Sequence, residues 1–238
     1  MQILFLSTKY ADDSNALASA AVKAGYDVRR LDYRDMDQVA EALKQGHSVS
    51  VFLGWLWSEA LMERGVHFIQ PSDRLLFDLD PASELRRAIK ETSLGQVKTE
   101  HQIFIKPLNG KEFDGQVVDQ AGLDFWLSVA GDIPVIQSEV VEIVSEYRFF
   151  VLDKQVVAAS FYKGEAQEQE AATALAETLA KRVATHTYAL DIGLMKDGSP
   201  LVIEANPVHQ SGIYQADPHA ILPCLQVSLA GKGTTAQT

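Results

Sequence analysis

The first 70 residues alternate short apolar runs with segments of helical length. The apolar runs at residues 3–6, 26–31 and 49–53 predict strands, and residues 13–24 and 36–44 predict the helices between them. Strands that alternate with helices in this way form a parallel sheet with helices on its faces. The sequence therefore predicts a small, doubly wound parallel α/β unit at the N-terminus.

A helix at residues 58–63 and a short strand at residues 67–69 complete this unit in the prediction. The turn after the first strand reads Ser-Thr-Lys-Tyr at residues 7–10 and lacks the Gly-x-Gly-x-x-Gly fingerprint of dinucleotide-binding sites. A dehydrogenase function therefore loses its main support.

Beyond residue 80 the pattern changes to closely spaced strands. Residues 81–93 predict a helix, and the β-rich runs that follow are typical of antiparallel hairpins. A long amphipathic helix is predicted at residues 166–185. The predicted strands are residues 102–106, 117–118, 135–138, 143–152, 155–162, 188–194 and 201–205.

Composition excludes several classes of protein. The formal net charge of −11 disfavours nonspecific binding to nucleic acid, which needs a basic footprint. No apolar run approaches the roughly 20 residues that span a bilayer, and residues 1–6 have no basic lead and predict a strand rather than a signal peptide. The single cysteine, Cys224, excludes an intramolecular disulfide and is expected in the core. We therefore expect a cytoplasmic protein that binds neither membrane nor nucleic acid.

The predicted strand at residues 201–205 is apolar but ends in polar side chains. Glu204 and Asn206 share one face because side chains alternate along a strand. Asp191 lies among apolar residues of the preceding strand, and a turn at residues 196–200 would let it face both. Carboxylate and carboxamide oxygens suit Mg²⁺. The alternative is that Asp191 and Glu204 are strand-end residues that face solvent or pair with Lys196.

Lys106 closes another apolar strand, and a loop with two glycines follows it at residues 109–115. A lysine ammonium and the backbone N–H groups of such a loop suit phosphate oxygens. The loop is not a P-loop, which has a Gly-x-x-x-x-Gly-Lys-Ser/Thr pattern. An ordinary hairpin loop is the alternative.

A third segment joins the extended stretch 135–142 to an apolar strand that contains Glu146 and Arg148. Extended backbone can meet the edge of an adenine, and a nearby acid can hold ribose hydroxyls. A guanidinium buried in an apolar strand needs an anionic partner. The alternative is therefore a structural ion pair between Arg148 and Glu146.

In their order and spacing these three segments resemble the ATP-grasp superfamily, and within it the glutamate ligases that extend the tail of a ribosomal protein. The resemblance covers about residues 103–213. It implies an α/β (α+β) chain with an ATP-grasp fold. The implied division is a Rossmann-like pre-ATP-grasp subdomain at residues 1–80, an ATP-grasp region at residues 81–230 and a flexible tail at residues 231–238.

The resemblance also implies a role for individual residues. Two cations, Lys163 and Arg148, would act on the phosphoryl group. The implied nucleotide contacts are Lys106, Gly110, Lys111, Gly115, Glu139, Val140, Val141, Glu142 and Glu146, and the implied Mg²⁺ ligands are Asp191, Glu204 and Asn206.

The implied activity is ATP-dependent ligation with Mg²⁺. ATP activates a carboxylate as an acyl phosphate, which an amine then attacks, so the site must neutralise phosphoryl charge and position both reactants. The expected partners are small-molecule or peptide carboxylates and amines. A phosphotransferase on the same scaffold and a non-catalytic nucleotide-binding module are the alternatives.

The sequence leaves three points open. Family members usually carry a further lysine upstream of Lys106, and Arg86, Arg87 or Lys98 could replace it here. His209, Tyr214 and Asp217 are candidates for contact with the acceptor but serve equally well as loop residues. The sequence does not indicate the oligomeric state, and a homodimer is one option because dimers are the commonest oligomers of soluble proteins.

Overall fold

The computed structural model describes residues 1–8, 11–72, 74–108 and 110–229. The predicted tail at residues 231–238, Lys9 and Tyr10 of the first turn, and Asn109 of the glycine loop lie outside the described residues. The strands are β1 (Gln2–Ser7), β2 (Asp27–Leu31), β3 (Ser48–Phe52), β4 (Ile89–Ser93), β5 (Ile103–Pro107), β6 (Gln116–Val118), β7 (Pro134–Ser138), β8 (Ile143–Leu152), β9 (Gln155–Gly164), β10 (Thr187–Met195) and β11 (Pro200–Asn206). The α-helices are α1 (Ala11–Lys23), α2 (Asp37–Lys44), α3 (Trp55–Glu63), α4 (Gln120–Ala130), α5 (Glu170–Arg182) and α6 (Pro218–Gln226).

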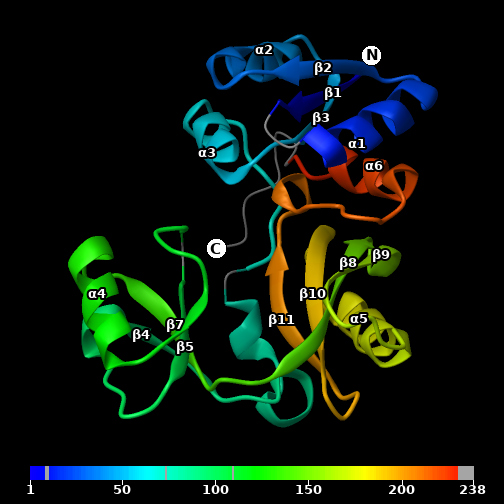
Figure 1. Ribbon diagram of the computed structural model, residues 1–238. Coiled ribbons are helices and arrows are strands. Elements are labelled where there is room, and N and C mark those ends of the chain that lie inside the picture. The colour runs from blue at the N-terminus through cyan, green and yellow to red at the C-terminus, as the bar shows by residue number, and fades with distance from the viewer. Residues whose placement is uncertain (9–10, 73, 109, 230–238) are drawn as a thin grey trace.

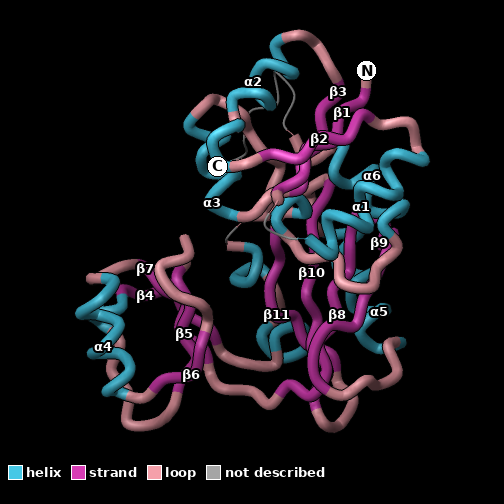
Figure 2. The backbone as a smooth tube through the Cα atoms, turned by 45° about the horizontal axis from the view of Figure 1, so that its top comes forward, coloured by secondary structure: helices cyan, strands magenta, loops and turns pink. Residues whose placement is uncertain are grey.

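These strands form three sheets. The N-terminal sheet has the parallel order β2–β1–β3. The β7 sheet has the antiparallel order β4–β7–β5–β6, and the β10 sheet has the antiparallel order β11–β10–β8–β9. Figure 1 shows the N-terminal sheet above the β10 sheet, with the β7 sheet and α4 to one side. Figure 2 shows the same separation of the β7 sheet from β8, β10 and β11.

Helices pack on both faces of the N-terminal sheet, against side chains that alternate between the two faces along β1. Leu4 and Leu6 on one face of β1 pack in a core with residues of α1 and α6. Ile3 and Phe5 on the other face pack with residues of α2 and α3. Each core excludes apolar surface from water, which is the main favourable term in folding. The doubly wound parallel unit that the sequence predicts is therefore confirmed.

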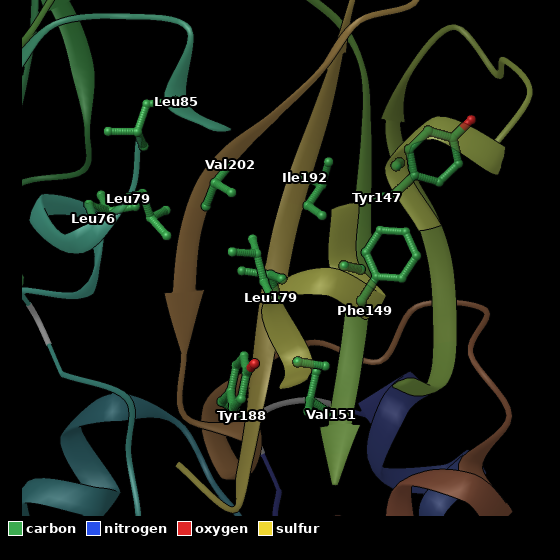
Figure 3. Close-up of a cluster of buried hydrophobic side chains, with 14 of the residues drawn as sticks. Leu76, Leu79, Leu85, Tyr147, Phe149, Val151, Leu179, Tyr188, Ile192 and Val202 are labelled. Atoms are coloured by element: carbon green, nitrogen blue, oxygen red, sulfur yellow. The ribbon is translucent and has the colours of Figure 1, made fainter. Parts of the chain in front are cut away.

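The β10 sheet buries one face against α5. Tyr147, Phe149 and Val151 alternate along β8 and point into a core that also contains Ile192 and Leu179 (Figure 3). Side chains at the intervening positions of β8 must point to the opposite face because the period of a strand is two residues. Glu146 and Arg148 therefore lie on the face away from α5.

The β7 sheet packs on α4. Ile105 of β5 and Val135 of β7 share a core with Leu123 of α4. The alternation along β5 then places Phe104 and Lys106 on the face opposite α4. Both of these residues line a cavity on that side of the sheet.

Two predicted elements are wrong and one was missed. Residues 81–93 form no continuous helix: a single π-helical turn, Pro81–Leu85, ends at Arg86, whose φ of 51° is left-handed, and β4 follows. β4 exists because it pairs with β7, a contact that local sequence does not encode. The predicted strand at residues 67–69 is only a bridge between Phe68 and Leu229. Helix α4 was not predicted, although Asp119 caps its N-terminus.

The C-terminal helix returns to the N-terminal unit. α6 contacts α1 and β3, and the backbone N–H of Ile69 donates to the carbonyl of Ser228 at 2.7 Å.

The division of the chain into subdomains between residues 80 and 81 stays a prediction. Among the described residues, none of the helices combines the length and apolarity needed to span a membrane.

Candidate functional site

Residues of the β7 sheet, the β10 sheet and α3 line a cavity of about 770 Å³. Its volume falls within the range of small-molecule sites, which is roughly 300–1,000 Å³. Eleven of the predicted site residues line it: Lys106, Gly110, Lys111, Gly115, Glu139, Val140, Val141, Glu146, Lys163, Glu204 and Asn206. Segments that are separated by up to 100 residues in sequence thus meet at one place.

Lys106 meets Glu204 across this cavity. Its Nζ lies 2.8 Å from Oε2 of Glu204, and both side chains are about 70% buried, with exposed fractions of 27% and 30%. Burial alone would raise the pKa of Glu204, but the charge and hydrogen bond of Lys106 and the amide of Asn206 outweigh it and lower the pKa to about 2. Glu204 is therefore ionised at neutral pH.

A second cation, Arg87, contacts the backbone of β11, the strand that carries Glu204. Its Nη1 donates to the carbonyl of Val202 at 2.8 Å and its Nη2 to that of Ile203 at 3.3 Å, while its side chain lines the cavity. Of the three candidates to replace the upstream lysine, Arg87 alone lines the cavity. Arg86 donates to the carbonyl of Pro200, and Lys98 is exposed elsewhere.

The glycine loop approaches the β7 sheet because Gly115 has no side chain. A Cβ on Gly115 would lie 2.6 Å from Cζ of Phe104, too close for any other residue without rearrangement. Gly110 has a φ of 130°, which L-residues rarely adopt. Phe113 stacks on Trp126 of α4 with ring centroids 4.7 Å apart, so the loop is anchored to the sheet that carries it.

The segment after β7 is tied to the start of β4. The backbone N–H of Glu139 donates to the carbonyl of Ala88 at 3.1 Å, and the Glu139 carboxylate accepts the N–H of Ala88 at 2.8 Å. Ser138 also donates to the Glu139 carbonyl at 2.8 Å. The backbone N–H and carbonyl of Glu139 are therefore both engaged, and Val140 and Val141 remain as the predicted contacts of an adenine.

The two acids predicted at the ribose differ in position. Glu146 lines the cavity, accepts a hydrogen bond from the hydroxyl of Tyr162 at 2.7 Å and pairs with Lys163 at 2.6 Å. Glu142 is exposed and does not line the cavity. Lys163 is 69% exposed, so this ion pair contributes little to the stability of the fold.

Arg148 is buried away from the cavity. Its Nε and Nη2 donate to the two carboxylate oxygens of Asp191 at 2.7 Å each, and its Nη1 donates to the carbonyl of Gly212 at 3.1 Å. The rings of Tyr162 and Tyr214 lie 5.4 Å from its guanidinium carbon. Burial alone would lower the pKa of Arg148, but the bonds and charge of Asp191 raise it above its ordinary value, so the guanidinium stays charged.

The predicted metal ligands meet in part. Asp191 and Glu204 are opposite each other in the register of β10 and β11 and therefore share a face. Nδ2 of Asn206 donates to Oε1 of Glu204 at 2.8 Å, which leaves the amide oxygen of Asn206 available. The Glu204 carboxylate and the Asn206 amide fit Mg²⁺ by their chemistry. Both oxygens of Asp191 are engaged by Arg148, so Asp191 fits only if that pair opens. Among the described residues, no group of three or more His, Cys, Asp or Glu side chains is arranged to hold a metal.

The three candidates for acceptor contact do not line the cavity. His209 is fully buried and stacks on Phe68 with ring centroids 4.0 Å apart. Asp217 caps α6, and Tyr214 stacks on Tyr162 at 5.0 Å. These contacts favour the alternative of structural loop residues.

Other cavity residues were not singled out from the sequence. Tyr162 lines it from β9, and Trp55 and Glu59 line it from α3. The spacing of Trp55 and Glu59 by four residues puts them on one helical face. No local signal shows that this face meets the two antiparallel sheets, because that contact depends on how the whole units pack.

A family model described as an ATP-grasp domain matches residues 85–224. A search of curated proteins finds no match. Among solved structures, the RimK domain protein ATP-grasp from Sphaerobacter thermophilus DSM 20745 is similar with a TM-score of 0.57 and 14% identity, over 94% of this chain and 99% of that one. D-cycloserine synthetase DcsG has a TM-score of 0.57 and 16% identity, over 94% of this chain and 98% of that one. D-alanine–D-alanine ligase from Bacillus anthracis, complexed with ATP, has a TM-score of 0.50 and 14% identity, over 94% of this chain and 96% of that one. At these identities the likeness shows a shared fold.

Proposed function

The chain belongs to the ATP-grasp family, whose domain model matches more than half of it, and on this premise we propose that it is an ATP-dependent ligase that joins a carboxylate to an amine. One observation carries the proposal. The cations Lys106, Lys111, Arg87 and Lys163 and the oxygen donors Glu204 and Asn206 line one cavity of about 770 Å³. Phosphoryl transfer requires this combination of positive charge and metal-binding oxygens.

The proposed reaction has two steps. A carboxylate oxygen attacks the γ-phosphorus of ATP, the bond to the β-phosphate oxygen breaks and ADP leaves with that electron pair. The amine nitrogen then attacks the acyl carbon, phosphate leaves, and the nitrogen releases a proton to solvent. Mg²⁺, when bound, would neutralise phosphate charge and orient the oxygens that react.

The chain's own residues bind and orient the reactants in this proposal. Lys106 exchanges the Glu204 carboxylate for a phosphate oxygen, which frees Glu204 and Asn206 to serve as metal ligands. Residues 110–115 of the glycine loop cover the phosphates from the β7 sheet, and Val140 and Val141 meet the adenine. Arg148, held by Asp191 and Gly212, positions the loop after β11 rather than touching the phosphates in this arrangement. The cytoplasmic location stays a prediction.

The test separates the ligase from its alternatives even when the natural amine is unidentified. The full chain is incubated with Mg·ATP, pooled amino acids and small peptides as carboxylates, and hydroxylamine as the nucleophile. A ligase forms hydroxamate and ADP in equal amounts, because hydroxylamine traps the acyl phosphate. The Lys106→Met variant should lose this product, whereas Lys90→Met, an exposed lysine on β4 outside the cavity, should keep it.

Two other results would contradict the proposal. A phosphorylated product that is stable to hydroxylamine identifies a phosphotransferase with a hydroxyl acceptor. Binding of Mg·ATP without ADP formation, with every carboxylate pool and with pooled amines and polyamines in place of hydroxylamine, identifies a nucleotide-binding module.

A further inference from the structure

The walls of the cavity differ in charge. Lys106 on β5 and Lys163 on β9 bring positive charge from the two antiparallel sheets. The wall formed by α3, all of which is described, carries no lysine or arginine into the cavity and contributes Trp55, Glu59 and Met62. The phosphates of a nucleotide therefore have partners on the sheets, and the α3 wall faces a different part of the bound reactants.

Glu59 differs from the cavity carboxylates on the sheets. Glu146 is paired with Lys163, and Glu204 is paired with Lys106. The Glu59 carboxylate has no hydrogen bond or ion pair with any described residue. The carboxylate of Asp114, an exposed residue, is the other such group among the acids that line the cavity. A partly buried carboxylate without a partner is costly and favours a cation beside it. Phosphate is repelled at this position.

Trp55 strengthens the preference for a cation. It lies one turn before Glu59 on the same face of α3, and both are partly buried at the cavity wall. An indole face attracts ammonium and guanidinium groups by about 0.5–2 kcal/mol. A carboxylate and an indole one turn apart can therefore hold one cationic group between them.

The start of α3 is fixed next to the reaction centre. The backbone N–H of Leu53, two residues before Trp55, donates to the carbonyl of His209 at 2.8 Å. His209 lies three residues after Asn206, and Gln210 in the same turn lines the cavity. The α3 wall is thereby tied to the segment that follows the proposed metal ligands, so a substrate anchored there can reach the phosphates.

We propose that Trp55 and Glu59 form a subsite for a cationic group of the amine substrate. The inference rests on the proposed function and deepens it. The reacting nitrogen must be neutral when it attacks, so the group at Glu59 is a second cation. The substrate class is a dibasic amine, namely a diamine or a basic amino acid.

Binding measurements test this subsite without turnover. Isothermal titration of the full chain, with and without Mg²⁺ and the non-hydrolysable analogue AMP-PNP, compares putrescine with butylamine, lysine with norleucine and arginine with citrulline. We expect at least one dibasic ligand to bind tenfold or more tightly than its less basic counterpart. Glu59→Gln should abolish that preference.

Glu63→Gln is the matched control, because Glu63 lies on the same helix and carries the same charge but is exposed outside the cavity. It should retain the preference, and both variants should bind AMP-PNP like the wild type. The subsite is excluded if no dibasic ligand is preferred, or if Glu59→Gln keeps the preference at an unchanged melting temperature. Failure of AMP-PNP to bind would instead contradict the proposed function. The titrations without nucleotide would still show whether the subsite prefers a dibasic ligand.

Discussion

Arg148 of β8 and Asp191 of β10 lie opposite each other and form a two-pronged ion pair, with N–O distances of 2.7 Å for both prongs. Asp191 is 1% exposed and Arg148 8% exposed. The pair lies on the face of the β10 sheet away from α5, and Arg148 also holds the Gly212 carbonyl of the loop after β11. The pair thus joins β8, β10 and the loop after β11 outside the cavity.

Asp191→Asn should destabilise the fold. The substitution leaves a buried guanidinium without its counter-charge, which costs about 3–5 kcal/mol. Urea denaturation followed by circular dichroism measures the loss. Asp153→Asn, which breaks the exposed pair with His186, should change the free energy of unfolding by less than about 0.5 kcal/mol. An Asp191→Asn variant as stable as the wild type would show that the pair is not structural.

Lys106→Met should weaken binding of a nucleotide and leave the fold intact. Lys106 pairs with the proposed metal ligand Glu204 across the cavity, and its loss removes a charge-assisted bond to phosphate. We expect the Kd for Mg·AMP-PNP to rise at least tenfold, which corresponds to about 1.4 kcal/mol. Titration calorimetry with Lys90→Met as the control checks this. Equal affinities for the two variants would place the phosphates elsewhere.

His209→Phe should make the protein more resistant to mild acid. Burial lowers the pKa of His209 to about 3, and its Nδ1 has no hydrogen-bond partner among the described residues. In the unfolded chain the imidazole of residue 209 binds a proton near pH 6.5, whereas in the folded chain it stays neutral down to about pH 3. The free energy of unfolding therefore falls as the pH drops from 6.5 toward 3. At pH 5 this term amounts to about 2 kcal/mol. Phenylalanine removes the term and keeps the stacking on Phe68.

Melting temperatures at pH 7.5 and pH 5 measure the effect. The decrease between the two values should be smaller for His209→Phe than for the wild type. His67→Phe, at an exposed histidine, should behave like the wild type. A decrease of the same size in all three proteins would mean that His209 is accessible to protons in the folded state.

Gly164→Ala should be more destabilising than Gly198→Ala. Both glycines have left-handed φ angles, 90° and 79°, so alanine is strained at either position by about 1–2 kcal/mol. A Cβ at position 164 would also lie 2.1 Å from the carbonyl oxygen of Val144, whereas none of the described atoms lies within 4 Å at position 198. We expect a loss of about 3 kcal/mol or more for Gly164→Ala and about 1 kcal/mol for Gly198→Ala in urea denaturation.

The sequence predicted the elements whose signal is local. The alternation of apolar runs indicated the parallel N-terminal unit, and the family expected from the three segments is confirmed. The segment from residue 81 to 93 was predicted wrongly because its strand forms only by pairing with β7. Helix α4 could have been predicted, because Asp119 and Gly131 mark its two ends.

The roles of single site residues stay predictions, although the structure places most of them together. Trp55 and Glu59 could not have been assigned to the site from sequence. Their spacing defines a face of α3, but the neighbour of that face is a sheet formed by residues far along the chain. Arg148 shows the same difficulty, since the alternative that sequence spacing offered for it was an ion pair with Glu146, and its partner in the structure is Asp191.

The sequence by itself determined which side chains share a face, because the period of a strand is fixed by the backbone. Glu204 with Asn206 and Glu146 with Arg148 follow from that period alone. Only the tertiary structure decided how the charges pair, Arg148 with Asp191 and Glu146 with Lys163. Pairing depends on the register between strands that are distant in sequence, and the packing of whole sheets sets that register.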